Sequence, residues 1–178
     1  MRSKAAKLLR LPKKSKILDV ATGTGSLAIA LAKKGYQVTG VDLSPDMLRQ
    51  AKKKVEPNLN VKFFNLDATN LPYPSQSFDG ASISFGLHDM PPEIGQKVLK
   101  EMRRVTKRGG SILVADHLEP SSHWFAQLFH PIIRKYETPN YVPFTHIGLT
   151  NILRKAGLHM SEKRCWFGLF QYTIAINQ

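Results

Sequence analysis

The sequence has little cysteine, few acidic residues and no long apolar run. Cys165 is its one cysteine, so no disulfide can form within these 178 residues and a cysteine-ligated metal cluster is excluded. No apolar stretch approaches the roughly 20 residues that cross a bilayer, and the basic N-terminal region lacks the apolar core of a secretory signal. With 42% hydrophobic residues, the chain can bury one sizeable core. We therefore expect a single domain over residues 1–178, located in the cytoplasm.

Basic residues outnumber acidic residues by 26 to 13, which gives a formal net charge of +13. The excess lies toward the N-terminus, because residues 1–60 hold 13 basic and 4 acidic residues. In residues 1–15, lysines and arginines alternate with alanines and leucines in a basic amphipathic segment. Such a segment predicts peripheral contact with an anionic membrane or with nucleic-acid phosphates. A charged face that only improves solubility is an equally open interpretation.

The strongest motif is an apolar strand that ends in a carboxylate and turns through a Gly-x-Gly loop into a helix. The strand covers residues 16–20 and contains Asp19, and the loop contains Gly23 and Gly25. Glycines let the backbone approach a ligand, and the N–H groups at the start of the helix face the same crevice. A second strand at residues 37–41 leads into Asp42, whose carboxylate can accept hydrogen bonds from ribose hydroxyls. This unit predicts a nucleotide-binding pocket.

Two cofactors fit such a unit, a dinucleotide and S-adenosylmethionine. Gly23, Gly25 and Ala28 match the dinucleotide pattern Gly-x-Gly-x-x-Gly/Ala. Asp19 favours the other cofactor, because a carboxylate at the end of the first strand would repel a pyrophosphate and attract the ammonium group of a methionine moiety. A role for Asp19 that is confined to the turn is the alternative.

Ordered motifs extend this pattern over most of residues 16–116. They lie at residues 18–25, 41–48, 65–72, 77–79, 84–87 and 104–114. With these motifs the chain resembles the class I S-adenosylmethionine-dependent methyltransferases, and especially their branch in ubiquinone and menaquinone biosynthesis. The resemblance implies an α/β, Rossmann-like fold with a mostly parallel sheet, an antiparallel C-terminal hairpin and helices on both faces.

The same resemblance assigns the cofactor-binding residues. The loop at residues 21–25 would hold the methionine part, Asp42 the ribose, Met47 one face of the adenine, and Asp67 with Ala68 the adenine edge. The family usually has glycine where Ala21 stands, so a positive φ at Ala21 would strain the pocket. The cofactor is then S-adenosyl-L-methionine and the product S-adenosyl-L-homocysteine. The full expected set is Asp19, Ala21, Thr22, Gly23, Thr24, Gly25, Asp42, Leu43, Met47, Asp67, Ala68 and Phe85.

The hydrophobic pattern predicts strands and helices in alternation, which indicates a parallel sheet covered on both faces. Strands are expected at residues 16–20, 37–41, 61–65, 80–85 and 111–115. Two final strands, at 159–167 and 170–177, are joined by a tight turn and must be antiparallel. Helices are expected at residues 3–9, 26–34, 45–55 and 91–105, with a further helix that ends at Gly157. Ser44 is the expected N-cap of the third helix, with Pro45 in its first position.

Residues 117–144 interrupt the alternation and are rich in aromatic residues. This insertion follows the carboxyl end of a central strand, where ligands bind in open α/β sheets. It is therefore expected on the substrate side, with Tyr141 and Phe144 as candidate substrate contacts. The helical spacing of Trp124, Phe125, Leu128 and Phe129 favours packing against the core instead.

Methyl transfer needs alignment and exclusion of water, and a general base if the acceptor carries a proton. His88 and His117 are the candidate bases, because each follows a central strand and imidazole titrates near neutral pH. Either could also be a structural loop residue. The other histidines lack metal-ligand spacing, so no metal site is expected.

These observations favour a methyltransferase that acts on a small, aromatic or quinone-like acceptor by in-line displacement. Two alternatives remain open. The positive charge allows an RNA methyltransferase, and the Gly-x-Gly loop allows a nicotinamide-dinucleotide-dependent oxidoreductase or a nucleotide-binding module without catalysis.

Overall fold

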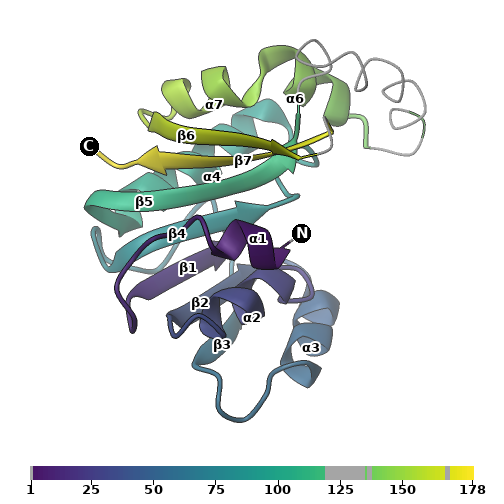
Figure 1. Cartoon of the computed structure of the whole chain (residues 1–178). Coiled ribbons are helices and arrows are strands. Elements are labelled where there is room, and N and C mark those ends of the chain that lie inside the picture. The colour runs from purple at the N-terminus through teal and green to yellow at the C-terminus, as the bar shows by residue number, and fades with distance from the viewer. Residues whose placement is uncertain (1, 119–134, 136–137, 167–168) are drawn as a thin grey trace.

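The computed structural model describes residues 2–118, 135, 138–166 and 169–178. Its strands form a seven-stranded sheet in the order β3-β2-β1-β4-β5-β7-β6 (Figure 1). The strands β1 to β5 run parallel to one another, whereas β7 is antiparallel to both β5 and β6. The expected parallel sheet with a C-terminal antiparallel hairpin is confirmed. The bounds are β1 Lys16–Val20, β2 Gln37–Asp42, β3 Val61–Asn65, β4 Phe78–Ser84, β5 Thr106–His117, β6 His159–Trp166 and β7 Phe170–Ile176.

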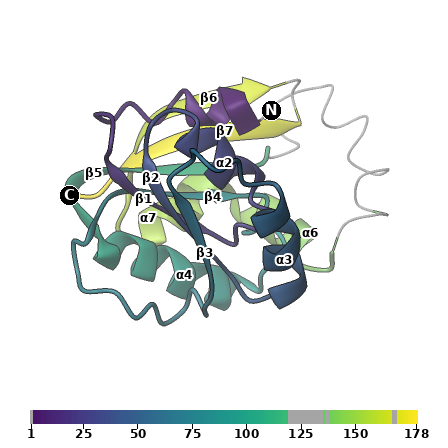
Figure 2. The same ribbon diagram turned by 90° about the horizontal axis from the view of Figure 1, so that it is seen from below.

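Helices cover both faces of the sheet, each over a separate apolar cluster. Residues of the first three helices pack with the sheet in one cluster, and residues of the last three pack in the other. Figure 2 shows α1 and α2 on one side of the sheet and α4 and α7 on the opposite side. No helix in the described ranges is long and apolar enough to span a bilayer. The bounds are α1 Arg2–Ala6, α2 Ser26–Ala32, α3 Pro45–Lys53, α4 Pro92–Val105, α6 Tyr141–Ile147 and α7 Leu149–Lys155.

Two elements differ from expectation. Strand β5 begins at Thr106 rather than at residue 111, because Gly109 and Gly110 exchange backbone hydrogen bonds with Asn177 beyond the end of β7. Helix α6 begins within the expected insertion, extends past its end at residue 144, and was not predicted. The expected packing of Trp124, Phe125, Leu128 and Phe129 falls outside the described residues.

The basic N-terminal segment packs on the body of the protein through its apolar side. Ala5, Ala6 and Leu9 are at most 1% exposed, and they belong to the same cluster as α2. The Tyr36 hydroxyl donates a hydrogen bond to the Leu9 carbonyl. The apolar face of this segment is therefore occupied within the chain, which leaves its charged side chains for any contact with a membrane.

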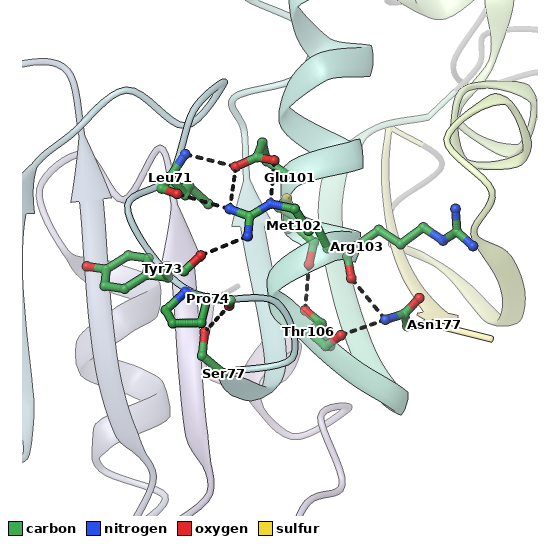
Figure 3. A network of polar contacts seen from close by, with 10 residues as sticks. Leu71, Tyr73, Pro74, Ser77, Glu101, Met102, Arg103, Thr106 and Asn177 are labelled. Atoms are coloured by element: carbon green, nitrogen blue, oxygen red, sulfur yellow. Dashed lines mark hydrogen bonds and ion pairs between the residues drawn. The ribbon is translucent and has the colours of Figure 1, made fainter.

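A polar network holds the end of α4 against the end of β7 (Figure 3). The Asn177 side chain, 5% exposed, donates hydrogen bonds to the carbonyls of Arg103 at 2.9 Å and Thr106 at 2.6 Å. The Thr106 hydroxyl donates to the Met102 carbonyl at 2.7 Å. Since the last carbonyls of a helix have no partners within it, Asn177 supplies the donors that they need.

On the other side of α4, Arg104 fixes the loop that precedes β4. Its guanidinium donates to the carbonyls of Leu71 at 3.0 Å and Tyr73 at 2.8 Å. It also pairs with Glu101 at 2.7 Å, and this contact lowers the pKa of the Glu101 carboxyl. The loop after β3, which carries part of the site described below, is thus attached to α4.

We expect the substitution Asn177→Ala to lower the free energy of unfolding by about 1–3 kcal/mol, because it leaves buried carbonyls without donors. Urea denaturation followed by circular dichroism measures the effect. The matched control is Asn151→Ala, which removes an exposed side-chain bond to the Ile147 carbonyl and should change stability by less than about 0.5 kcal/mol. Equal losses in the two variants would contradict the role of Asn177.

Candidate active site

A buried carboxylate on β1 organises the loop that follows the strand. Asp19 is 1% exposed and lies between β2 and β4, opposite Gly40 and Ser82. Its two oxygens accept hydrogen bonds from the hydroxyls of Ser82 and Thr22, each at 2.6 Å. Burial raises the pKa of Asp19 to about 6, against the lowering effect of these hydrogen bonds. Asp19 thereby ties the loop to two strands.

The loop from residue 21 to 25 contains three residues with positive φ. Ala21 has φ of 48°, a conformation that costs an L-residue about 1–3 kcal/mol, so the strain considered from the sequence is present. Gly23 has φ of 53°, and a Cβ added there would meet nothing within 4 Å. Gly25 has φ of 73°, and a Cβ there would collide with the Phe63 ring at 2.7 Å. Gly23 therefore leaves space for a ligand, whereas Gly25 permits close packing of α2 on the sheet.

Asp42, the last residue of β2, joins two loops. It accepts hydrogen bonds from the Gly23 N–H at 2.7 Å and the Ser44 N–H at 2.9 Å. Ser44 in turn caps α3, because its hydroxyl accepts a bond from the Met47 N–H at 3.3 Å, and Pro45 opens the helix. The expected cap and first turn are confirmed.

The carboxyl ends of β1 to β4 surround a cavity of about 430 Å³. Asp42, Asp67 and Asp89 lie on its wall, and among the described residues no lysine or arginine lines it. The pKa of Asp67 is lowered by hydrogen bonds from Thr69. The remaining wall is mainly apolar and backbone: Ala21, Gly23, Val41, Leu43, Ser44, Met47, Leu66, Ala68, Thr69, Phe85, Gly86, Met90, Ile94 and Val98.

Eight of the expected cofactor residues lie on this wall, and four do not. Asp19 and Thr22 are buried behind it and bonded to each other. The Thr24 hydroxyl lies 3.4 Å from that of Ser26, and Gly25 packs against Phe63. The structure therefore gives these four residues a role in shaping the loop. The eight on the wall are Ala21, Gly23, Asp42, Leu43, Met47, Asp67, Ala68 and Phe85.

The cavity fits S-adenosylmethionine better than a dinucleotide. Three aspartates without a basic residue on the wall would repel a pyrophosphate and attract a cationic sulfonium. Gly23 leaves open space beside the loop, and Asp42 and Asp67 present acceptors that suit ribose hydroxyls and an adenine amino group. Its volume is in the range of small-molecule sites.

A second buried group joins the ends of β4 and β5. Asp116, 1% exposed, accepts hydrogen bonds from the backbone N–H groups of His117 at 2.8 Å and Leu87 at 3.1 Å. His88 Nδ1 lies 2.6 Å from the same carboxylate. Since Asp116 accepts backbone hydrogen bonds at both oxygens, His88 Nδ1 is the donor in this contact. Nε2 lies 3.4 Å from Asp89, a residue of the cavity wall.

His117 packs beside this pair in an apolar environment. Its ring centroid lies 4.6 Å from that of His88 and 5.0 Å from that of Tyr141. Burial, and then the neighbouring His88, lower the pKa of His117 to about 4. One ligand atom from each of His88, Asp116 and His117 lies within 4.8 Å of the others, so the cluster could hold a metal ion only if Asp116 gave up some of its hydrogen bonds.

The two candidate substrate contacts are both buried, and neither lies on the cofactor cavity. Tyr141, 2% exposed, packs against the two histidines. Phe144, 4% exposed, lines a second, apolar cavity of about 270 Å³ between α4 and α7. Met90 lies on the walls of both cavities.

Sequence reasoning missed several wall residues. Ile94 and Val98 reach the cavity from α4, where their spacing of four residues places them on one helix face. That spacing was visible in the sequence. The pairing of His88 with Asp116 was not, because it depends on β4 and β5 being neighbours in the sheet.

The fold and the cavity define a nucleotide-dependent transferase of the class I methyltransferase type. Residues 17–110, more than half of the chain, match the family model of a methyltransferase domain, and the chain belongs to this family. It is 37% identical to a demethylmenaquinone methyltransferase of Bacillus licheniformis over 72% of this chain and 56% of that protein. A protein of the same name from Listeria welshimeri is 37% identical over 80% of this chain and 61% of its own length.

Solved structures share the fold. A SAM-dependent methyltransferase from Methanosarcina mazei aligns with a TM-score of 0.74 at 24% identity, over 93% of each chain. A protein from Pyrococcus horikoshii aligns with a TM-score of 0.78 at 22% identity, over 99% of this chain and 90% of that one. The chain thus shares this fold, and it spans little more than half the length of the curated relatives that it matches.

We expect His117 to make stability depend on pH between about 6.5 and 4. Unfolded His117 binds its proton near pH 6.5 and the folded residue only near pH 4, so the unfolded state binds more protons and acidification destabilises the protein. Asp19, with its raised pKa of about 6, acts in the opposite direction. Replacing His117 by Gln should therefore reduce the loss of unfolding free energy from pH 7 to pH 5 by about 2 kcal/mol.

Urea titrations of wild type and variant at pH 7 and pH 5 measure the change in unfolding free energy between the two pH values. This change does not depend on how much stability the substitution itself removes at a single pH. The matched control is His159→Gln, the same substitution on the exposed start of β6, outside the site. An unchanged dependence in His117→Gln would show that His117 is not held neutral by its surroundings.

Proposed function

We propose that this chain carries out S-adenosylmethionine-dependent methylation of a ring carbon in a quinol related to demethylmenaquinol. The observation that carries the proposal is the acidic cavity at the carboxyl ends of the parallel strands, with the buried His88–Asp116 pair next to its wall. The names of the relatives from Bacillus and Listeria support the choice of acceptor.

Different wall residues bind different parts of the methyl donor. Asp42 accepts from the ribose, and Asp67 with the Ala68 N–H meets the adenine edge. Met47 and Leu43, 43% and 69% exposed, cover the apolar faces at the mouth of the cavity. Gly23 lets the backbone approach the amino-acid part. When bound, S-adenosylmethionine supplies a methyl group that is attached to a positively charged sulfur. The sulfur is the leaving group and becomes a neutral thioether.

His88 is the general base in this proposal. Asp116 holds Nδ1 and so orients Nε2, the atom that accepts the proton, toward the side of Asp89 and the cavity wall, an arrangement in which a carboxylate orients an imidazole. The proton comes from a hydroxyl of the quinol, and the ionised oxygen raises the electron density of the neighbouring ring carbon. That carbon forms the new bond to the methyl group as the methyl–sulfur bond breaks. The ring hydrogen then leaves as a proton to solvent, and His88 returns its proton to the ring oxygen. His117, Tyr141 and Phe85 exclude water from the imidazole through their ring contacts.

Transfer of radiolabelled methyl groups tests the proposed function. A 1,4-naphthoquinol with a short prenyl chain and one unsubstituted ring position should be methylated when it is kept reduced. The corresponding quinone should not, because its ring carbons are electrophilic. Total RNA is offered in parallel, and calorimetry with S-adenosylhomocysteine and NADH checks the cofactor. Labelling of RNA alone, or binding of NADH alone, would refute the proposal.

We expect His88→Gln to lower kcat by about 10²- to 10⁴-fold, the usual contribution of a general base. Affinity for S-adenosylhomocysteine should stay within about twofold, since His88 lies beside the cavity and not on its wall. Single-turnover methyl transfer and calorimetry give the two values. His159→Gln serves again as the control, and a parallel loss of binding in His88→Gln would point to a structural role.

A further inference from the structure

The second cavity, of about 270 Å³, lies between α4 and α7, on the face of the sheet opposite α1 and α2 (Figure 2). The charged residues of its wall, Glu93 and Lys155, are exposed, so they lie where the cavity opens to solvent. An apolar interior with a few polar groups at its mouth is typical of a site for a small apolar ligand. The buried residues of the wall are Leu87, Gly95, Phe144 and Ile152.

Gly95 keeps this cavity open at the expense of its own helix. It lies inside α4, and its N–H donates to the Pro91 carbonyl at 3.0 Å, as a helical residue does. Glycine destabilises the interior of a helix relative to alanine. Among the described residues, a Cβ at this position would meet Leu87 Cδ2 at 3.7 Å, which is an ordinary contact. Neither a turn nor close packing therefore requires glycine here, and its small size leaves space in the cavity.

A side-chain bond holds the two helices apart beside the cavity. Gln96, the residue after Gly95, donates from Nε2 to the Ile152 carbonyl of α7 at 2.9 Å. Both of these residues belong to the cavity wall. The bond fixes the spacing of α4 and α7 where they border the cavity, so the apolar walls do not need to close on each other.

The cavity adjoins the proposed base. Leu87 directly precedes His88, and its N–H donates at 3.1 Å to Asp116, the carboxylate that orients His88. The Phe144 ring centroid lies 6.3 Å from that of His88. Met90, which has a flexible side chain, borders both this cavity and the cofactor cavity. An acceptor ring beside His88 therefore has an apolar cavity next to it.

We propose that this cavity binds an apolar chain attached to the ring of the acceptor, while the ring itself lies beside His88. The inference rests on the proposed function, because it takes a naphthoquinol with a prenyl chain as the acceptor. A prenyl chain has no polar atom, so it needs no hydrogen bond from the buried wall, and burial of its carbons provides the affinity. Carbons beyond the cavity extend past Glu93 and Lys155 into solvent, so the gain levels off with chain length.

Three 1,4-naphthoquinols that differ only in the chain test this assignment: one without a chain, one with a ten-carbon and one with a twenty-carbon prenyl chain. Each is kept reduced, and methyl transfer is measured at saturating S-adenosylmethionine. For the wild type we expect the ten-carbon chain to lower KM at least about tenfold relative to the ring alone, with kcat within about twofold. The twenty-carbon chain should lower KM by no more than about a further twofold.

Two substitutions at Gly95 fill the cavity to different extents. Gly95→Leu should raise KM for the ten-carbon acceptor about tenfold, and it should leave KM for the chainless acceptor and the affinity for S-adenosylhomocysteine within about twofold. Gly95→Ala should raise the same KM less, and it should unfold at a higher urea concentration than the wild type because alanine favours a helix. The control is Lys100→Leu, which adds the same side chain to an exposed position of α4 and should leave every KM unchanged.

Equal KM values for the chainless and ten-carbon acceptors in the wild type would overturn the assignment, although the proposed function would stand. An equal rise of KM for both acceptors in the Gly95 variants would overturn it as well, since the glycine would then serve the fold. If the wild type methylates none of the three acceptors, the proposed function itself fails, and that result is distinct from the other two.

Discussion

Carboxylates at the ends of parallel strands hold the site together. Asp19 on β1, Asp42 on β2 and Asp116 on β5 each accept hydrogen bonds from the loops that follow these strands or their neighbours. Burial of a carboxylate is costly unless donors compensate it. The loops are therefore fixed by the need to satisfy these groups, and the cavity is the space that the fixed loops leave. The shape of the site depends on this constraint more than on the apolar contacts around it.

The order of strands and helices followed from the sequence because its hydrophobic periodicity and its glycine turns agree with each other. Ser44 and Pro45 marked the start of α3 correctly for the same reason. Helix α6 carried no such signal, since Pro143 lies within it and its N-cap Asn140 makes no side-chain capping bond. The early start of β5 depends on pairing with Asn177, 67 or more residues away in the chain, which no local pattern reports.

The site was predictable where its residues lie within one motif, as Asp42, Met47 and Asp67 do. The site was not predictable where the role of a residue depends on the residues that pack against it in the folded chain. Gly25 matched a ligand-binding pattern, yet its conformation serves the packing of Phe63. The basic N-terminal segment matched a membrane-binding pattern, yet its apolar residues are buried in the core. In both cases the sequence shows which residue types are present but not which surface they meet.

The sign of the charge on the cavity wall has a consequence for turnover. Asp42, Asp67 and Asp89 attract a ligand that carries a positive sulfur atom. Once that atom has become neutral, the same carboxylates attract the ligand less strongly. A wall of this kind therefore favours the charged donor over the neutral product in the competition for the cavity, and methyl transfer weakens the hold on the cofactor that remains.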